Sequence, residues 1–131
     1  MNNMLNILLG AVIASIVPLA TLYFNNQKWK KEKLVEHLRI KHDRLEKIYG
    51  EILFELSDSI RDNLYSEETI AKIRIYSSAK ASKIFFDMIA SKDNKAEYEN
   101  NKRICAALFS IAAKEHLLEI EYKIEKILTT S

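Results

Sequence analysis

The chain has 131 residues, of which 29% are charged, and it contains two glycines, one proline and one cysteine. A sheet protein needs a turn every 8–12 residues or so, so this shortage argues against an all-β fold and an α/β nucleotide-binding fold. One cysteine excludes an internal disulfide framework and a multi-cysteine zinc site, and 20 Lys+Arg against 18 Asp+Glu give no reason to expect DNA binding.

The charged residues are unevenly distributed along the chain. Residues 1–27 contain no charged side chain, and residues 28–47 carry eight basic and four acidic residues. The remainder, residues 50–131, carries twelve basic and fourteen acidic residues. Such asymmetry indicates a membrane or polyanion contact near the N-terminus. We therefore divide the chain into an anchor, residues 1–27, and a helical domain, residues 28–131.

Residues 4–24 are predicted to form a transmembrane helix. These 21 residues would extend roughly 31 Å at ~1.5 Å per residue, close to a hydrocarbon core of ~30 Å. The polar residues within them are uncharged, and Pro18 is compatible with a membrane helix. Aromatic residues suited to the headgroup region lie at the far end: Tyr23, Phe24 and Trp29.

Three alternatives to this span are weaker. A cleaved secretory signal would need a basic leader and a small residue where Pro18 stands before the best cleavage position. A buried core helix is usually shorter, and an interfacial helix would carry a charged face. We therefore expect an uncleaved, single-pass transmembrane helix.

The residues that flank the span predict its orientation. The leader has no Lys or Arg, whereas four basic residues follow the span closely: Lys28, Lys30, Lys31 and Lys33. Basic residues stay cytoplasmic, so we expect the N-terminus outside and the helical domain in the cytoplasm. The same polybasic juxtamembrane segment suits anionic lipid headgroups, at ~1 kcal/mol per basic residue near the surface.

Small residues four positions apart form a candidate self-association face on the span. The pairs are Gly10 with Ala14 and Ala11 with Ser15. This spacing lets two membrane helices approach closely. Together with a predicted surplus of apolar surface on the helical domain, it favours a homo-oligomer.

Hydrophobic periodicity predicts three helices after the span, over about 28–64, 66–91 and 94–128. Their short connections predict antiparallel neighbours. The predicted fold is therefore all-α: one N-terminal transmembrane helix, then a cytoplasmic antiparallel three-helix bundle with long first and third helices. The polar residues 25–27 could be a hinge, so continuity of the first helix with the span is left open.

Sequence signals also predict details of these helices. Leu38, Leu45 and Ile52 share a heptad row typical of a coiled coil, and Ser66 is a good N-cap. Gly50 indicates a close helix contact or a bend. The polar residues of the first helix that we assign to its outer face include Glu51 and Glu55. The predicted buried stripe of the third helix is Ile104, Leu108, Ile111, Leu118, Ile124, Ile127 and Leu128.

No enzyme signature is present in the sequence. Glycines at positions 10 and 50 alone cannot build a phosphate-binding loop, and no nucleophile-elbow or zinc-protease motif occurs. His116, beside Glu115 and near Glu119, is interpreted as part of a surface ion cluster, and Cys105 as a small core residue. We expect no catalytic residue, metal or cofactor.

One basic face of the predicted second helix could bind an anionic ligand. Lys72, Tyr76, Lys80 and Lys83 follow each other by four, four and three residues. Cations and an aromatic ring on one face could hold a phosphate-bearing ligand such as a nucleotide. An ordinary solvated face is the simpler interpretation.

Three functions remain open at this point. The first is an interaction or regulatory module at the inner face of the membrane, bound to lipid and to a protein partner. The alternative is a small membrane-perturbing effector, of the bacterial defence or mobile-element type, whose helical domain senses a phosphate-bearing signal and gates oligomerised spans. A holin-like pore former is the third, and it would not need so long a cytoplasmic domain.

Overall fold

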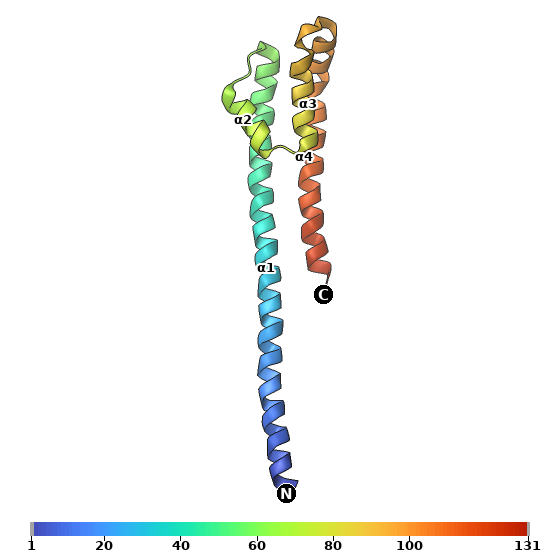
Figure 1. The fold of residues 1–131 in the computed structure, drawn as a ribbon. Coiled ribbons are helices and arrows are strands. Elements are labelled where there is room, and N and C mark those ends of the chain that lie inside the picture. The colour runs from blue at the N-terminus through green and yellow to red at the C-terminus, as the bar shows by residue number, and fades with distance from the viewer. Residues whose placement is uncertain (1, 131) are drawn as a thin grey trace.

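The computed structural model describes residues 2–130, and these residues form helices with no strand (Figure 1). The predicted all-α class is therefore confirmed. The elements in chain order are α1 (Asn2–Asp62), α2 (Glu67–Tyr76), α3 (Ala79–Ala90), the short 3-10 helix η1 (Ser91–Asp93) and α4 (Lys95–Thr129).

Residues 25–27 do not form a hinge but are part of the first helix. α1 is a single helix of 61 residues that passes through Pro18 and through the polar stretch without ending. Its N-terminal part includes an 18-residue window with a mean hydropathy of 2.2. Among the described residues, α1 is the one helix long and apolar enough to cross a membrane. Thr21 donates its hydroxyl hydrogen to the carbonyl of Val17 at 2.9 Å, so this polar group is satisfied within the helix.

The remaining helices pack along the C-terminal half of α1. Figure 1 shows α4 running antiparallel beside α1, with α3 lying against α4 and α2 lying against α1. The N-terminal half of α1 extends beyond the C-terminal end of α4 without a neighbour. The apolar segment is thus separate from the packed core.

The prediction of a single second helix is wrong, because this segment forms two helices, α2 and α3, that are separated by two serines. Ser77 and Ser78 are both extended, with ψ angles of 150° and 160°. The Ser78 hydroxyl accepts from the backbone N–H of Ala81 and caps a new helix, α3. The first N–H groups of a helix have no backbone carbonyl to bind, and a serine hydroxyl can accept from one of them. Two serines in a row therefore favour a new helix start over a continuous helix.

The predicted starts of two helices, at Ser66 and Asn94, are confirmed by their caps. The Ser66 hydroxyl accepts from the N–H of Thr69 at 3.1 Å and starts α2. The Asn94 side chain accepts from Glu97 N at 3.3 Å and starts α4. Asn63 has a φ of 56°, and α1 ends just before it. This left-handed conformation is one that asparagine tolerates better than most residues.

The core joins all four α-helices. Its fully buried side chains include Ile52 and Leu56 of α1, Ile73 of α2, Phe85 and Met88 of α3, and Cys105 and Phe109 of α4. The interpretation of Cys105 as a core residue is therefore confirmed. Burial raises the pKa of its thiol to about 11, which keeps it protonated and unreactive.

The predicted buried stripe of α4 is largely wrong. Ile104, Leu108, Ile111 and Leu118 are 41–55% exposed. α4 carries two apolar rows, and the core uses the other one, which contains Phe109, Ala112 and Ala113. Phe109, Ala112 and Ala113 belong to one core cluster with residues of α1 and α3, and small side chains such as alanine allow helices to pack closely.

Near its junction with the apolar segment, α1 buries Val35 at 4% exposure, whereas its neighbour Leu34 is 49% exposed. The close helix contact expected at Gly50 is absent. A Cβ atom added at Gly50 would meet nothing within 4 Å, so this glycine does not mark a close helix contact.

Candidate functional site

Basic residues surround α1 directly after its apolar segment. We call Lys28, Trp29, Lys30, Lys31 and Lys33 the basic collar. The Trp29 ring is 56% exposed, and the Lys33 ammonium lies 5.8 Å from its centroid. Tyr23 and Phe24, one turn earlier, are also exposed, and their rings meet edge to face at 5.8 Å. Amphipathic rings beside cations are typical of a membrane–water boundary.

Ion pairs within the helix leave most of the collar charge in place. Lys28 lies 4.0 Å from Glu32, and Lys33 lies 3.6 Å from Glu36, all with well exposed side chains. Such pairs contribute little free energy. Lys31 donates a hydrogen bond to the carbonyl of Thr130, at the C-terminal end of α4. The collar therefore also holds the end of α4 beside the apolar segment.

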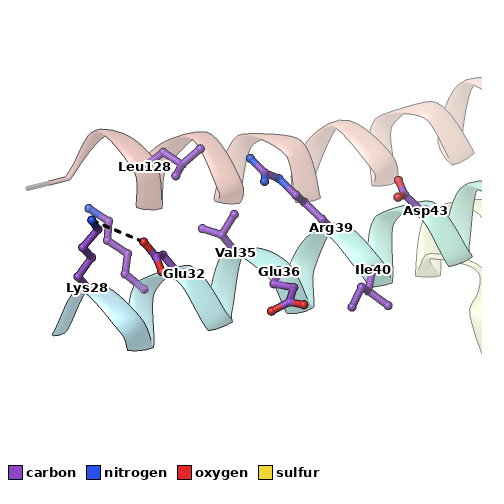
Figure 2. Close-up of a pocket in the computed structure, with 9 residues that line it drawn as sticks. Lys28, Glu32, Val35, Glu36, Arg39, Ile40, Asp43 and Leu128 are labelled. Carbon is purple, nitrogen blue, oxygen red and sulfur yellow. Dashed lines mark ion pairs between the residues drawn. The ribbon is translucent and has the colours of Figure 1, made fainter. Parts of the chain in front are cut away.

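A groove of about 510 Å³ lies beside the collar, between α1 and the last turns of α4 (Figure 2). In Figure 2, Val35 and Arg39 point toward α4, whereas Glu36 and Ile40 point away from it. Its charged lining residues are Lys28, Lys31, Arg39, Glu32, Glu36 and Asp43. Because these charges balance, the groove does not select a strongly anionic ligand.

The predicted self-association residues lie on the part of α1 that extends beyond the C-terminal end of α4. Gly10, Ala11 and Ala14 are exposed, and a Cβ atom at Gly10 would meet nothing within 4 Å. The side chain of Ser15 lies outside the described residues. Self-association through these residues therefore stays a prediction.

The predicted anion-binding face does not exist as one helical face. The break at Ser77–Ser78 places Lys72 and Tyr76 on α2, and Lys80 and Lys83 on α3. Lys80 is engaged by α4, since its Nζ lies 2.7 Å from Glu115 Oε2. The regular spacing along the sequence therefore does not become a regular surface.

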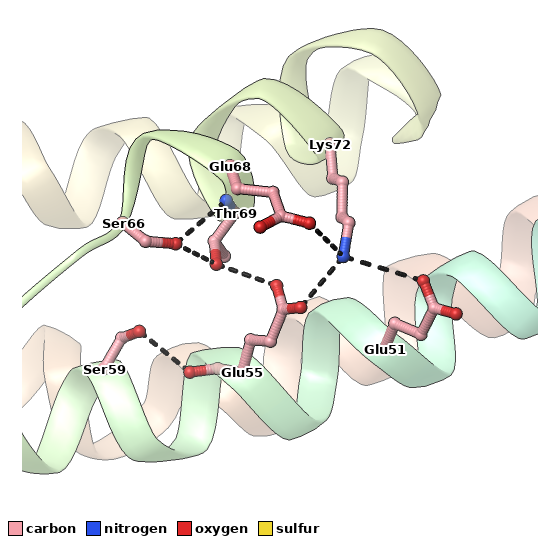
Figure 3. Close-up of polar contacts among 7 residues, drawn as sticks. All are labelled: Glu51, Glu55, Ser59, Ser66, Glu68, Thr69 and Lys72. Carbon is pink, nitrogen blue, oxygen red and sulfur yellow. Dashed lines mark hydrogen bonds and ion pairs between the residues drawn. The ribbon is translucent and has the colours of Figure 1, made fainter.

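Lys72 is surrounded by carboxylates (Figure 3). Its Nζ lies 2.8 Å from Glu55 Oε1 and 3.6 Å from oxygens of Glu51 and Glu68. The buried Thr69 hydroxyl donates to Glu55 Oε2 at 2.8 Å. Glu51 and Glu55 therefore face α2, and their assignment to an outer face is wrong. With three acidic neighbours, Lys72 fastens α2 to α1 and has no free charge for an anionic ligand.

The same contacts shift the protonation of Glu55. The hydrogen bond from Lys72 lowers the pKa of Glu55 below its usual 4.5, Thr69 acts in the same direction, and burial opposes them. Folded Glu55 thus releases its proton more readily than unfolded Glu55. Its contribution to stability is present above about pH 4.5 and is lost as the pH falls through the lowered value.

A second pocket, of about 440 Å³, lies where α2 meets α3. We call it the joint pocket; its lining residues are Lys41, Arg44, Leu45, Ile48, Ile75, Tyr76, Ser77, Ser78 and His116. The Arg44 guanidinium lies 6.0 Å from the centroid of the Tyr76 ring. Among the described residues, Ser77 Oγ is a buried polar atom without a hydrogen-bond partner. Two cations, hydroxyl groups and an aromatic ring meet here, and no acidic residue lines the pocket.

Tyr49 contacts two residues that line this pocket, Ser78 and His116, and joins the elements that carry them to α1. Its ring is buried, and its hydroxyl oxygen accepts from the backbone N–H of Ser78 at 2.9 Å and lies 2.7 Å from His116 Nδ1. The interpretation of His116 as part of a surface ion cluster is therefore wrong. Burial lowers the pKa of His116 most, Lys41 and Lys123 lower it further, and Glu119 opposes them.

Sequence reasoning missed Tyr49, Arg44 and His116 as neighbours. The signal for Tyr49 was present, because Leu45, Tyr49, Ile52 and Leu56 recur by four, three and four residues. The residues that meet at the joint pocket come from α1, α2 and α4 and from the α2–α3 connection. Such a convergence depends on the break at Ser77–Ser78, which periodicity alone did not predict.

Neither protein-family models, curated proteins nor solved structures give a match to this chain. Within residues 2–130, no group of three or more His, Cys, Asp or Glu side chains is placed to hold a metal ion. Over these same residues, the fold and the collar define a helical protein with one helix of transmembrane length. Its function has to be inferred from this geometry.

Proposed function

We propose that the protein is a single-pass membrane protein whose cytoplasmic helical domain acts as an interaction or regulatory module at the inner face of the membrane. The apolar part of α1 spans the bilayer with the N-terminus outside. The basic collar binds anionic headgroups on the cytoplasmic side. The helices after the collar form the antiparallel bundle predicted from the sequence, with α2 and α3 replacing its second helix.

The continuity of α1 is the observation that supports this role most strongly. One uninterrupted helix contains the apolar segment, the collar and the core residues Ile52 and Leu56. A helix of 61 residues is about 90 Å long at ~1.5 Å per residue. Because no hinge separates these parts, a partner that shifts the packed helices also tilts or rotates the span. Such coupling is what a regulatory module at a membrane requires.

The first prediction concerns anchoring and orientation. We expect the full-length protein to sediment with membranes, to resist carbonate extraction and to dissolve in detergent. A C-terminal tag should be protected from external protease in spheroplasts. Replacing Lys28, Lys30, Lys31 and Lys33 with Gln should expose the tag in part of the population, because the charge bias that sets orientation is then weakened.

The matched control replaces four exposed lysines far from the span: Lys83, Lys95, Lys114 and Lys123. This variant should keep the wild-type orientation. A wild-type protein that stays in the supernatant after high-speed centrifugation without detergent would refute the anchoring. A tag exposed in the wild type would refute the orientation alone.

The joint pocket favours a second candidate function, the ligand-sensing membrane effector. Lys41 and Arg44 can pair with phosphate oxygens, Ser77 Oγ has unused hydrogen-bonding capacity, and the Tyr76 ring offers a surface for stacking. Both cations are on α1, so a bound ligand would act directly on the helix that carries the apolar segment. The ligand class is therefore a phosphate-bearing molecule with a flat ring, such as a nucleotide.

Inducible expression in cells loaded with a potential-sensitive dye separates the two candidates. The effector predicts that induction depolarises the cells and that Arg44→Gln weakens this response. The control Arg103→Gln, an exposed position on α4 that does not line the pocket, should leave it unchanged. An unchanged membrane potential in every strain would leave the interaction module as the supported function.

A further inference from the structure

α4 carries a row of large apolar side chains on the face that its own core does not use. We call this row the α4 seam; its members and their exposed fractions are Ile104 (42%), Leu108 (41%), Ile111 (55%), Leu118 (51%) and Tyr122 (66%). An exposed row of this size in a helical domain is unusual unless a partner covers it. It is also separate from the apolar segment of α1.

The spacing of the seam is that of a coiled coil. Its members recur by four, three, seven and four residues, and the missing central position is Glu115. Alternating steps of four and three place all six residues on alternating a and d positions of a heptad repeat. The row that faces the core, which contains Cys105, Phe109 and Ala112, lies on a different side of the helix. One helix therefore presents two apolar faces, of which one is already packed.

The charges beside the seam indicate which partner it fits. In a parallel pair of coiled-coil helices, each g position meets the e position five residues further along the other helix. For the α4 seam, Lys114 would then meet Glu119 of a second copy. By the same rule Glu121 would meet Lys126 of that copy, so both pairs have opposite charges. Residues five apart lie on different sides of their own helix, so these pairs are not satisfied within one copy.

The membrane favours the same arrangement. This step rests on the proposed anchoring: two copies with the same orientation in one bilayer are related by an axis along the membrane normal. Their α4 helices then run parallel, which is the orientation in which the g and e charges match. Two copies anchored in this way cannot place their α4 helices antiparallel.

Glu115 has a built-in counterion at the centre of the seam. Its Oε2 lies 2.7 Å from the Nζ of Lys80 on α3. In a parallel pair, each copy would bring its own lysine to its own glutamate. A polar residue at one a position of an apolar seam fixes the register of a coiled coil at some cost in stability.

We infer that a second copy of this chain docks on the α4 seam, with the two α4 helices parallel and in register. The surface joins copies through their cytoplasmic domains. It therefore acts in addition to any association of the spans.

Cysteine crosslinking of the full-length protein in membranes tests the seam. Ile111→Cys and Leu118→Cys should each give a disulfide-linked dimer with a mild oxidant. Both residues lie at d positions, and in a parallel, in-register pair each d residue faces the same residue of the second copy. Ser110→Cys is the matched control: it is exposed and adjacent in sequence, but it points away from the seam. We expect several-fold more dimer from either seam variant than from the control. The native Cys105 is buried and should not contribute.

A charge exchange tests the orientation independently. In the Leu118→Cys background, Lys114→Glu or Glu119→Lys should each reduce the yield of dimer, because each places like charges at a g–e contact. Combining Lys114→Glu with Glu119→Lys should restore it. Equal crosslinking at positions 110, 111 and 118 would overturn the seam. Crosslinking at only one of the two d positions would overturn the parallel register.

The inference and the anchoring can fail separately. Fractionation of the same samples reports whether the protein is in the membrane. If the protein is soluble and the seam variants still crosslink, the anchoring is refuted and the seam is retained. If the protein is in the membrane and only the control-level dimer forms, the seam is refuted and the anchoring is retained.

Discussion

Replacing Phe109 with alanine is expected to lower the free energy of unfolding by about 3–5 kcal/mol. Phe109 has no exposed surface, and its ring meets the Tyr49 ring edge to face at 6.0 Å. Truncation removes buried apolar surface and leaves a cavity in the core beside Tyr49 of α1. Because a domain of this size has a total stability of about 5–15 kcal/mol, one such change removes a large part of it.

Denaturant unfolding of the detergent-solubilised protein, followed by circular dichroism, measures this effect. The matched control is Phe54→Ala on α1, where the ring is 75% exposed. This control should change the free energy of unfolding by less than about 0.5 kcal/mol. Equal destabilisation by the two substitutions would contradict the packing of α4 against α1.

Helix ends were predictable from the sequence because they depend on local chemistry. Ser66 and Asn94 cap helices with side chains three residues from the N–H groups that they bind. Cap signals of this kind need no knowledge of tertiary contacts. Ser78 is a cap by the same chemistry, but it lies in the middle of an apolar pattern that continues on both sides. At Ser78, periodicity predicts that the helix continues, whereas capping predicts that a new helix begins. The structure has the new helix.

The choice of buried face on α4 was not predictable in the same way. Both rows have helical spacing, and the row with Ile104, Leu108 and Ile111 is the more hydrophobic one. The core instead buries Cys105, Phe109 and Ala112. Close packing against two helices depends on shape, so small residues beside one large ring can be favoured over a row of branched side chains. A choice of the buried face by hydrophobicity alone therefore picks the face of α4 that is exposed in the structure.

The candidate site shows the same division between local and long-range information. The basic collar was predictable, since it depends only on charge next to an apolar segment. The environment of Lys72 was not, because its three acidic neighbours come from two helices. A sequence shows how many carboxylates exist, and only the packing of α2 against α1 shows that they surround this lysine.

Replacing Tyr49 with phenylalanine is expected to lower the free energy of unfolding by about 1–3 kcal/mol, although only one oxygen atom is removed. The ring stays in place, with its edge contacts to Phe109 and His116. What is lost is the acceptor for the backbone N–H of Ser78 and the hydroxyl beside His116 Nδ1. Both groups would then lie in a partly buried place without this partner, and leaving buried polar groups unpaired is costly.

This prediction should be measured at pH 7.5 and compared with the wild-type stability at lower pH. Because the pKa of His116 is lowered in the folded protein, the unfolded chain takes up the proton first, near pH ~6.5. The stability that neutral His116 contributes is therefore present above about pH 6.5 and is lost as the pH falls toward the lowered pKa. Tyr122→Phe is the matched control, since Tyr122 is 66% exposed. A cost at Tyr49 no larger than at Tyr122 would show that the hydroxyl does not join α1, α3 and α4.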